Sequence, residues 1–196
     1  MMRVAGLFVA GVSVALSVAH LGMTGHMLGH MLAVAVAAPM LAWRSEAGAD
    51  RGADGGTGQG APLLIAALEL VVVWSWHLPA ARAAADGSTM VALAEQAMFL
   101  GVGFALWRSA LVRPAGGVAA LLLTSMHMTL LGVLIGLAPR ALYAGMAMHP
   151  AFGLDALADQ QLGGVVMLVI GGASYCLGGL WMLAGLLRYR AGEVRA

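Results

Sequence analysis

No charged residue lies between Arg3 and Arg44, although this stretch is long enough to cross a lipid bilayer twice. A helix needs about 20 apolar residues to cross the hydrocarbon core, and further uncharged runs recur along the chain. Of the 196 residues, 61% are apolar and only 10% are charged, which is outside the usual range of soluble domains. Because helices satisfy their own backbone polar groups in such segments, we predict an all-α, polytopic transmembrane helical bundle that forms a single membrane domain, residues 1–196.

Six apolar runs are predicted to span the membrane. They cover residues 4–20, 25–43, 61–78, 90–107, 117–137 and 162–187. In this arrangement every basic residue except Arg82 and Arg140 falls on the side of the N-terminus. Since positively charged short loops stay in the cytoplasm, both termini and the low-complexity loop 44–60 are expected there. A competing interpretation treats residues 1–19 as a cleaved signal peptide with Arg3 as its charged start.

Charge and motif content argue against several classes of protein. The ten basic residues are all arginine, nine acidic residues balance them, and they form no basic stripe, which argues against a nucleic-acid partner. The sequence contains no nucleophile elbow, no activated cysteine and no paired carboxylates at hydrolytic spacing. We therefore expect a protein that is neither an enzyme nor a nucleic-acid-binding protein.

Half of the six histidines lie in one uncharged segment, HLGMTGHMLGHML, residues 20–32. His26 and His30 are four positions apart, so on a helix their rings are separated by about 40° and one turn. His77 ends the third predicted span, and the topology places it in the same outer third of the protein. Imidazole binds copper, zinc, iron and nickel well. These three histidines are therefore expected to form the core of a metal site.

Other side chains near the same face are candidate weaker ligands. Met23 and Met27 repeat beside the histidines, and thioether sulfur favours Cu(I), although methionine also packs well between helices. Glu95 lies in the first turns of the fourth span, where an ionisable residue often marks function. His127, in the fifth span, and Asp159 complete the candidate set, and Asp159 has the alternative role of capping the sixth helix. Copper would best explain a set that contains both imidazole and thioether.

Two further features leave alternatives open. Glu69, at the centre of the third span, is too far along the helix from His77 to share an ion, and we expect it on a proton path or at a helix contact. Gly132 and Gly136, one turn apart, suit a close helix contact either within the chain or in a homodimer.

Five features carry a family resemblance. They are His26-Met27-Leu28-Gly29-His30-Met31-Leu32, Trp76-His77-Leu78-Pro79, Glu95 followed by Phe99 and Trp107, Pro139-Arg140-Ala141-Leu142-Tyr143, and Leu157-Ala158-Asp159-Gln160-Gln161-Leu162-Gly163-Gly164 with Met167 after it. In this order they resemble the CtaG-type cytochrome c oxidase assembly factors, bacterial membrane proteins associated with copper insertion into haem-copper oxidases. Gln96 departs from the family pattern, because members commonly have a histidine at this position.

The resemblance implies copper, as Cu(I), for the bound metal and haem-copper cytochrome oxidase subunits for partners, with a periplasmic copper chaperone as a further partner. It also implies a multi-pass protein of the bacterial inner membrane that binds copper at the outer face and helps insert it into the oxidase. Two other functions remain open from the residues. A copper permease would need polar groups continuing inward, and a b-type haem electron carrier would bind iron between His30 and His127.

Overall fold

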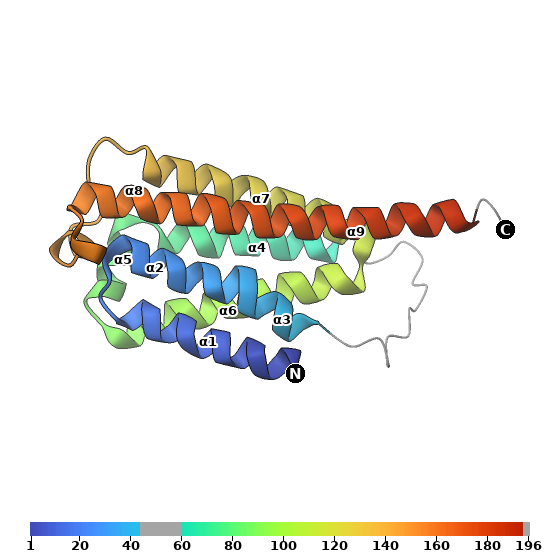
Figure 1. The fold of residues 1–196 in the computed structure, drawn as a ribbon, viewed down its shortest axis with the longest axis horizontal. Helices are drawn as coiled ribbons and strands as arrows, with labels where there is room; N and C mark the ends of the chain where they lie inside the picture. The colour runs from blue at the N-terminus through green and yellow to red at the C-terminus, as the bar shows by residue number, and fades with distance from the viewer. Residues whose placement is uncertain (44–59, 194–196) are drawn as a thin grey trace.

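The computed structural model describes residues 1–43 and 60–193, and every regular element within these residues is a helix. The helices lie side by side and form one elongated bundle (Figure 1). The predicted all-α fold is therefore confirmed. The predicted loop 44–60 falls outside the described residues except for Gly60.

The bundle consists of long helical rods joined by short connections. In chain order the rods are α1 (Met2–Val18); α2 (Gly22–Met31) continued by η1 (Leu32–Ala37) and α3 (Ala38–Ala42); α4 (Ala61–Trp76); α6 (Thr89–Val112); α7 (Pro114–Gly136); and α8 (Ala156–Val166) continued by η4 (Met167–Gly171) and α9 (Gly172–Glu193). The connections contain the short helices α5 (Pro79–Asp86), η2 (Met146–Met148) and η3 (Ala151–Gly153). The π-helical turns η1 and η4 keep the two composite rods continuous.

Several rods are long and apolar enough to cross a membrane. Four single candidates are Gly22–Ala42, Thr89–Val112, Pro114–Gly136 and Ala156–Tyr189. A fifth candidate is the pair formed by α4 and α5, which is bent by 69°, whereas α1 is apolar but has only 17 residues. These lengths support a multi-pass membrane protein. Six spans and cytoplasmic termini stay predictions.

The connections divide between the two ends of the bundle (Figure 1). The turn between α1 and α2, helix α5 and residues 137–155 gather at one end, which we call the α5 end. The start of α1 and the end of α9 lie at the opposite end, where α9 extends beyond the other helices. Successive rods therefore run in alternating directions, as short connections between neighbouring helices require.

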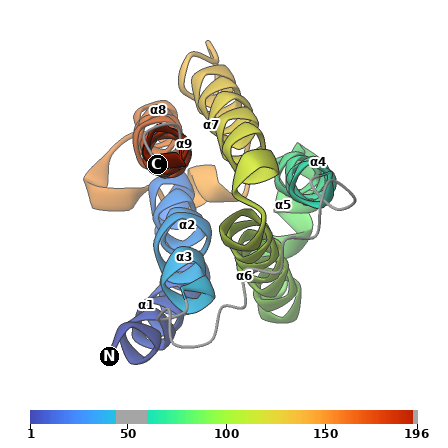
Figure 2. The ribbon, with the colours of Figure 1, turned by 90° about the vertical axis from the view of Figure 1, so that its right-hand side faces the viewer.

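Helix α7 packs against α8 with the two backbones in direct contact, and Figure 2 shows α7 beside the α8–α9 rod. A Cβ atom added at Gly164 would lie 2.5 Å from the Gly136 nitrogen, and one added at Gly132 would lie 2.8 Å from the Gly164 carbonyl oxygen. No larger residue fits at these positions without a backbone shift. The close contact expected for Gly132 and Gly136 therefore forms within the chain, and a homodimer stays a prediction.

Polar contacts in the middle of the bundle also join helices. The Tyr175 hydroxyl donates a hydrogen bond of 2.5 Å to the Glu69 carboxylate, and both side chains are fully buried. The Trp107 indole donates to the Val34 carbonyl oxygen at 3.1 Å and stacks on the Tyr175 ring. Glu69 thus connects α4 to α9, which is the helix-contact role expected for it.

Candidate metal centre

Helix α2 places His26 and His30 one turn apart on a buried face. The side chain of His26 is 4% exposed and that of His30 is fully buried. Their ring centroids lie 6.3 Å apart. This is the arrangement that four-residue spacing on a helix predicts.

His77 lies at the bend between α4 and α5. Pro79 opens α5, and the residue before a proline is driven out of helical conformation, so Leu78 is extended (φ −66°, ψ 138°). The backbone N–H of His77 donates to the Val73 carbonyl oxygen at 3.2 Å, and its ring Nδ1 donates to the same oxygen at 2.6 Å. Because Nδ1 carries the proton, the lone pair of His77 Nε2 is free to bind a metal.

Tyr143 fixes the same bend from the connection between α7 and α8. Its hydroxyl donates a hydrogen bond of 2.9 Å to the His77 carbonyl oxygen. Burial raises the pKa of Tyr143 to about 12, partly offset by the charge of Arg82, so the hydroxyl keeps its proton and remains a donor. The backbone N–H, the carbonyl and Nδ1 of His77 are therefore all partnered, which holds the ring in one orientation.

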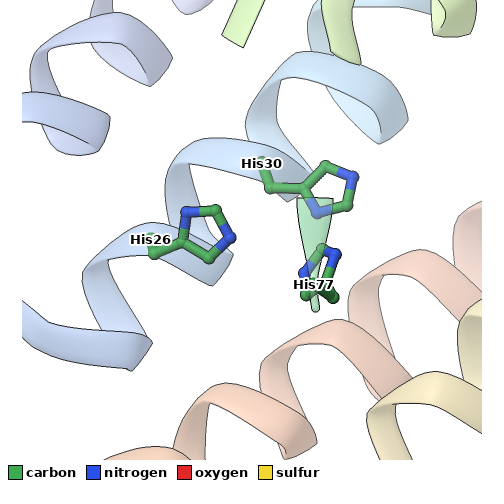
Figure 3. Close-up of side chains that lie close together, drawn as sticks. All are labelled: His26, His30 and His77. Carbon is green, nitrogen blue, oxygen red and sulfur yellow. The ribbon is translucent and has the colours of Figure 1, made fainter. Parts of the chain in front are cut away.

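The three histidines converge on one point (Figure 3). Each offers a ring nitrogen, and these nitrogens lie within 4.8 Å of one another. Among the described residues, neither nitrogen of His30 nor the Nε2 atoms of His26 and His77 have a hydrogen-bond partner. Buried polar atoms are normally paired, so this cluster of free nitrogens needs an explanation. A ligand set of this kind suits a transition metal of the copper, zinc, iron or nickel type.

Phe99 of α6 forms an apolar wall of the pocket. Its ring stacks on His30 with centroids 3.9 Å apart and an interplanar angle of 15°, and it also lies 6.3 Å from the ring of His26 and 6.1 Å from that of His77. Phe99 is fully buried. The stacking fixes the plane of the His30 ring.

A buried ion pair adjoins the pocket. Arg82 of α5 is 2% exposed, and its Nη1 lies 2.5 Å from both carboxylate oxygens of Glu95 on α6. The same Nη1 lies 3.1 Å from His26 Nδ1. Arginine has only donors, so His26 Nδ1 is the acceptor and the proton of a neutral His26 ring lies on Nε2. Glu95 Oε1 lies 3.9 Å from that Nε2.

Arg82 was missed as a site residue by sequence reasoning. Its charge contributed only to the predicted orientation, although Arg82 is one of two arginines expected on the outer side. An arginine that breaks the charge bias of a membrane protein is itself a signal, because it needs a counter-charge or a functional reason to be there.

The two candidate methionines are buried in the helix interface. Met23 and Met27 are 1% and 0% exposed. A Cβ atom added at Gly163 of α8 would lie 3.0 Å from Met23 Cγ, so the Met23 side chain fills the space left by this glycine. His127 is 8% exposed with both ring nitrogens unpartnered, but it is not part of the three-histidine group.

Asp159 caps a helix other than its own. Its carboxylate accepts hydrogen bonds from the backbone N–H groups of Met23 (2.6 Å) and Thr24 (3.1 Å) at the start of α2. The N-cap of α8 is Asp155, which accepts from Leu157 and Ala158. The interpretation of Asp159 as a cap of the sixth helix was therefore wrong. Both of its oxygens are engaged in holding α2 against α8.

Gln96 also has a structural role. Its side-chain amide donates to the Ser13 hydroxyl at 2.8 Å and to the Gly29 carbonyl oxygen at 3.0 Å. These bonds tie α6 to α1 and α2. The departure from the family pattern at this position therefore joins helices instead of adding a donor to the three-histidine centre.

The fold and the pocket together define a class: multi-pass helical membrane proteins with a buried cluster of histidines. The family model of the cytochrome c oxidase caa3 assembly factor (Caa3_CtaG) matches residues 59–189. Since this is more than half of the chain, the chain belongs to that family, and cytochrome c oxidase is the partner that the family description implies. No curated protein and no solved structure matches the chain.

The matched region contains only part of the candidate centre. His77, Arg82 and Glu95 lie within residues 59–189, whereas His26 and His30 precede them. The histidine pair on α2 is therefore connected to the family region by the fold, through its contacts with α6 and α8.

Proposed function

We propose that this oxidase assembly factor binds Cu(I) at His26, His30 and His77 and helps insert it into cytochrome c oxidase. The observation that carries the proposal is the convergence of buried ring nitrogens that lack hydrogen-bond partners. Copper is cargo in this proposal: the protein takes it up and gives it to the oxidase.

The charge around the pocket favours a monovalent ion. Arg82 and Glu95 neutralise each other, and within the described residues the three-histidine group contains no carboxylate. Each charge brought into a buried site carries a desolvation penalty, which is smaller for Cu(I) than for a divalent ion such as Zn²⁺. Structural Zn²⁺ sites also take four ligands, commonly with thiolates, whereas this pocket offers three neutral imidazoles.

The three ligands are not equivalent. His77 is fixed through its own backbone and Nδ1, and His30 is held by stacking on Phe99. His26 instead shares its Nδ1 with Arg82. Binding copper through Nε2 requires the ring proton to move to Nδ1, and binding through Nδ1 requires that atom's lone pair, so either mode releases Arg82 from His26. We infer that His26 is the ligand that exchanges first, which suits a site that must release its metal.

The rival functions fit less well. A permeation path would have to pass the middle of the bundle, where Glu69 is bonded to Tyr175 and the Trp107 ring is stacked on Tyr175. A haem iron between His30 and His127 would need the two rings on opposite sides of a porphyrin. His30 lies instead within 5.3 Å of the His77 ring and against Phe99.

We also propose that the protein works at the outer face of the membrane. With the predicted orientation, the α5 end faces the outer side of a bacterial inner membrane, where a periplasmic copper chaperone would supply Cu(I). The protein has no catalytic step in this scheme, because transfer of Cu(I) is a ligand exchange.

The experiment is copper binding to detergent-purified protein under anaerobic conditions. Wild-type protein supplied with Cu(I) and then desalted should retain about one copper ion per chain. Only the folded protein should bind copper, because the fold brings the three histidines together. A His26→Ala, His30→Ala, His77→Ala variant that keeps its helical circular dichroism should retain none. The matched control is His127→Ala, which removes a buried unpartnered histidine outside the centre and should retain copper. Equal, negligible copper in wild type and the triple variant would overturn the proposal.

A further inference from the structure

A cavity leads from the surface at the α5 end to the edge of the metal centre. Its volume is about 370 Å³, and its lining includes His26 and Arg82 at depth and His20, Met148 and His149 nearer the surface. The last three side chains are exposed in the structure. His26 belongs both to this cavity and to the three-histidine centre, so it is the point at which the two spaces meet.

A second group of metal-binding side chains lies at the mouth of the cavity. The rings of His20 and His149 are 6.2 Å apart in an edge-to-face arrangement. Met148, next to His149 in sequence, is 74% exposed and therefore contributes little to packing. We call His20, Met148 and His149 the rim group. It combines two imidazoles with one thioether, which is a donor set that favours Cu(I) over harder cations.

The backbone that carries His20 is strained. His20 has φ 49°, in the left-handed region, and Gly22 has φ 57°. A residue other than glycine in this conformation is strained and persists only where neighbouring structure enforces it. The two bonds from Asp159 to the start of α2 provide that enforcement. The turn thereby holds His20 next to His149, although the two residues are far apart in sequence.

We propose that the rim group is a second copper site, which captures Cu(I) from outside and passes it through the cavity to His26. This inference rests on the proposed function of the three-histidine centre. An exposed site with few donors binds weakly and exchanges quickly, while the buried centre offers three ring nitrogens. Copper therefore moves inward from the site of lower affinity to the site of higher affinity. The metal stays Cu(I) throughout, and the only bonds that change are those between copper and its ligands.

At the deep end of the cavity, copper must displace Arg82 from His26 before it enters the centre. Arg82 Nη1 holds His26 Nδ1, and Arg82 Nε lies 3.4 Å from a carboxylate oxygen of Asp86, which also lines the cavity. Arg82 can therefore remain paired with Glu95 and Asp86 when copper takes the place of its contact with His26. No uncompensated positive charge is left in the cavity after transfer.

The test measures the rate at which copper enters the centre. Cu(I) is presented as a coloured complex with a Cu(I)-selective chelator, and loss of colour is followed in time for wild-type protein and for His20→Ala, Met148→Ala, His149→Ala. The rim variant should finally hold as much copper as wild type but fill about tenfold more slowly, because it lacks the raised local concentration of metal beside the centre. The control is Met90→Ala, which removes an equally exposed methionine (74%) outside the cavity lining.

A second measurement isolates the rim group. In the His26→Ala, His30→Ala, His77→Ala variant, chelator competition should detect a weakly bound Cu(I) that disappears when the rim residues are also replaced. If the rim variant filled with copper as fast as wild type, this inference would be overturned. If copper binding still required the three central histidines, the proposed function would stand. Failure of wild-type protein to bind any copper would overturn both.

Discussion

Asp159 and the three-histidine centre are both buried polar groups that face the half of α2 nearest the α5 end. The Asp159 carboxylate accepts two hydrogen bonds from backbone N–H groups of that helix. One and two turns further along, His26 and His30 present ring nitrogens to the pocket, and neither nitrogen of His30 nor Nε2 of His26 has a hydrogen-bond partner. Asp159 and the histidines are thus similarly buried, but the carboxylate has hydrogen-bond partners and several of the ring nitrogens do not.

On the proposed function, this difference distinguishes a residue that stabilises the fold from residues that bind a ligand. A buried polar group that makes all of its hydrogen bonds stabilises the folded chain. Removing it leaves its partners buried without a hydrogen bond. A buried group without partners lowers stability until a ligand arrives. Asp159 should therefore matter for folding and little for copper, and the histidines should matter for copper and little for folding.

Glu95→Leu should give the largest loss of stability. The ion pair between Glu95 and Arg82, like Asp159, is a buried group whose partners are present. Arg82 would keep a buried charge faced only by Asp86, 3.4 Å from its Nε, and breaking one side of a buried pair lowers the free energy of unfolding by about 3–5 kcal/mol. Chemical unfolding of the detergent-purified protein measures the change. The double variant Arg82→Leu, Glu95→Leu should recover much of the loss. A single variant as stable as wild type would show that the pair does not form.

Asp159→Ala should lower the free energy of unfolding by about 2–4 kcal/mol, since it leaves the N–H groups of Met23 and Thr24 without a charged acceptor. The folded fraction should still bind Cu(I). The matched control is Asp155→Ala, an exposed cap of α8 whose loss should cost about 1 kcal/mol. If Asp159→Ala abolished copper binding in protein of unchanged stability, Asp159 would be a ligand and the distinction drawn above would fail.

His30→Leu should change the unfolding free energy of metal-free protein by less than about 1 kcal/mol, because it replaces an unpartnered imidazole with an apolar side chain. The same change should remove stable Cu(I) binding. Thermal unfolding with and without Cu(I) separates the two effects, since only wild-type protein should be stabilised by the metal. A large loss of metal-free stability would show that His30 has partners in the folded protein.

Tyr143→Phe should have the smallest effect, a loss of about 1 kcal/mol for one hydrogen bond to the His77 carbonyl oxygen. The pKa of Tyr143 is raised to about 12 in the folded protein, above that of an unfolded tyrosine, so its stabilising contribution is complete below about pH 10 and is lost as the pH rises through 12. Between pH 9 and pH 12 the free energy of unfolding should therefore fall less steeply with pH in Tyr143→Phe than in wild type. Parallel profiles would exclude this contribution.

Much of the bundle could be predicted because apolar run length reports directly on membrane-spanning helices. The run 25–43 corresponds to Gly22–Ala42, and the run 162–187 lies within Ala156–Tyr189. Helix α5 was not predicted as a separate element. It is short, alanine-rich and turns Arg82 inward, so neither run length nor the usual outward placement of charge indicates it.

The site was predictable where it depends on helical spacing and topology. The spacing of His26 and His30, together with the predicted end of the third span at His77, correctly predicted that three histidines lie close together. The role of Asp159 depends instead on a contact across 136 positions of sequence, and the contact of Arg82 with His26 depends on the bend at Pro79. Neither follows from periodicity, because each requires the relative placement of two rods.

X-ray absorption spectroscopy at the copper edge of anaerobically filled protein tests the central claim most directly, because it identifies the atoms bound to the metal. A shell of nitrogen scatterers with the multiple-scattering pattern of imidazole, lost in His30→Leu, is the expected result for Cu(I) held by His26, His30 and His77. Sulfur scatterers would place the metal at a methionine, Met23 or Met27 beside the centre or Met148 of the rim group, and copper bound identically in His30→Leu would contradict the three-histidine centre.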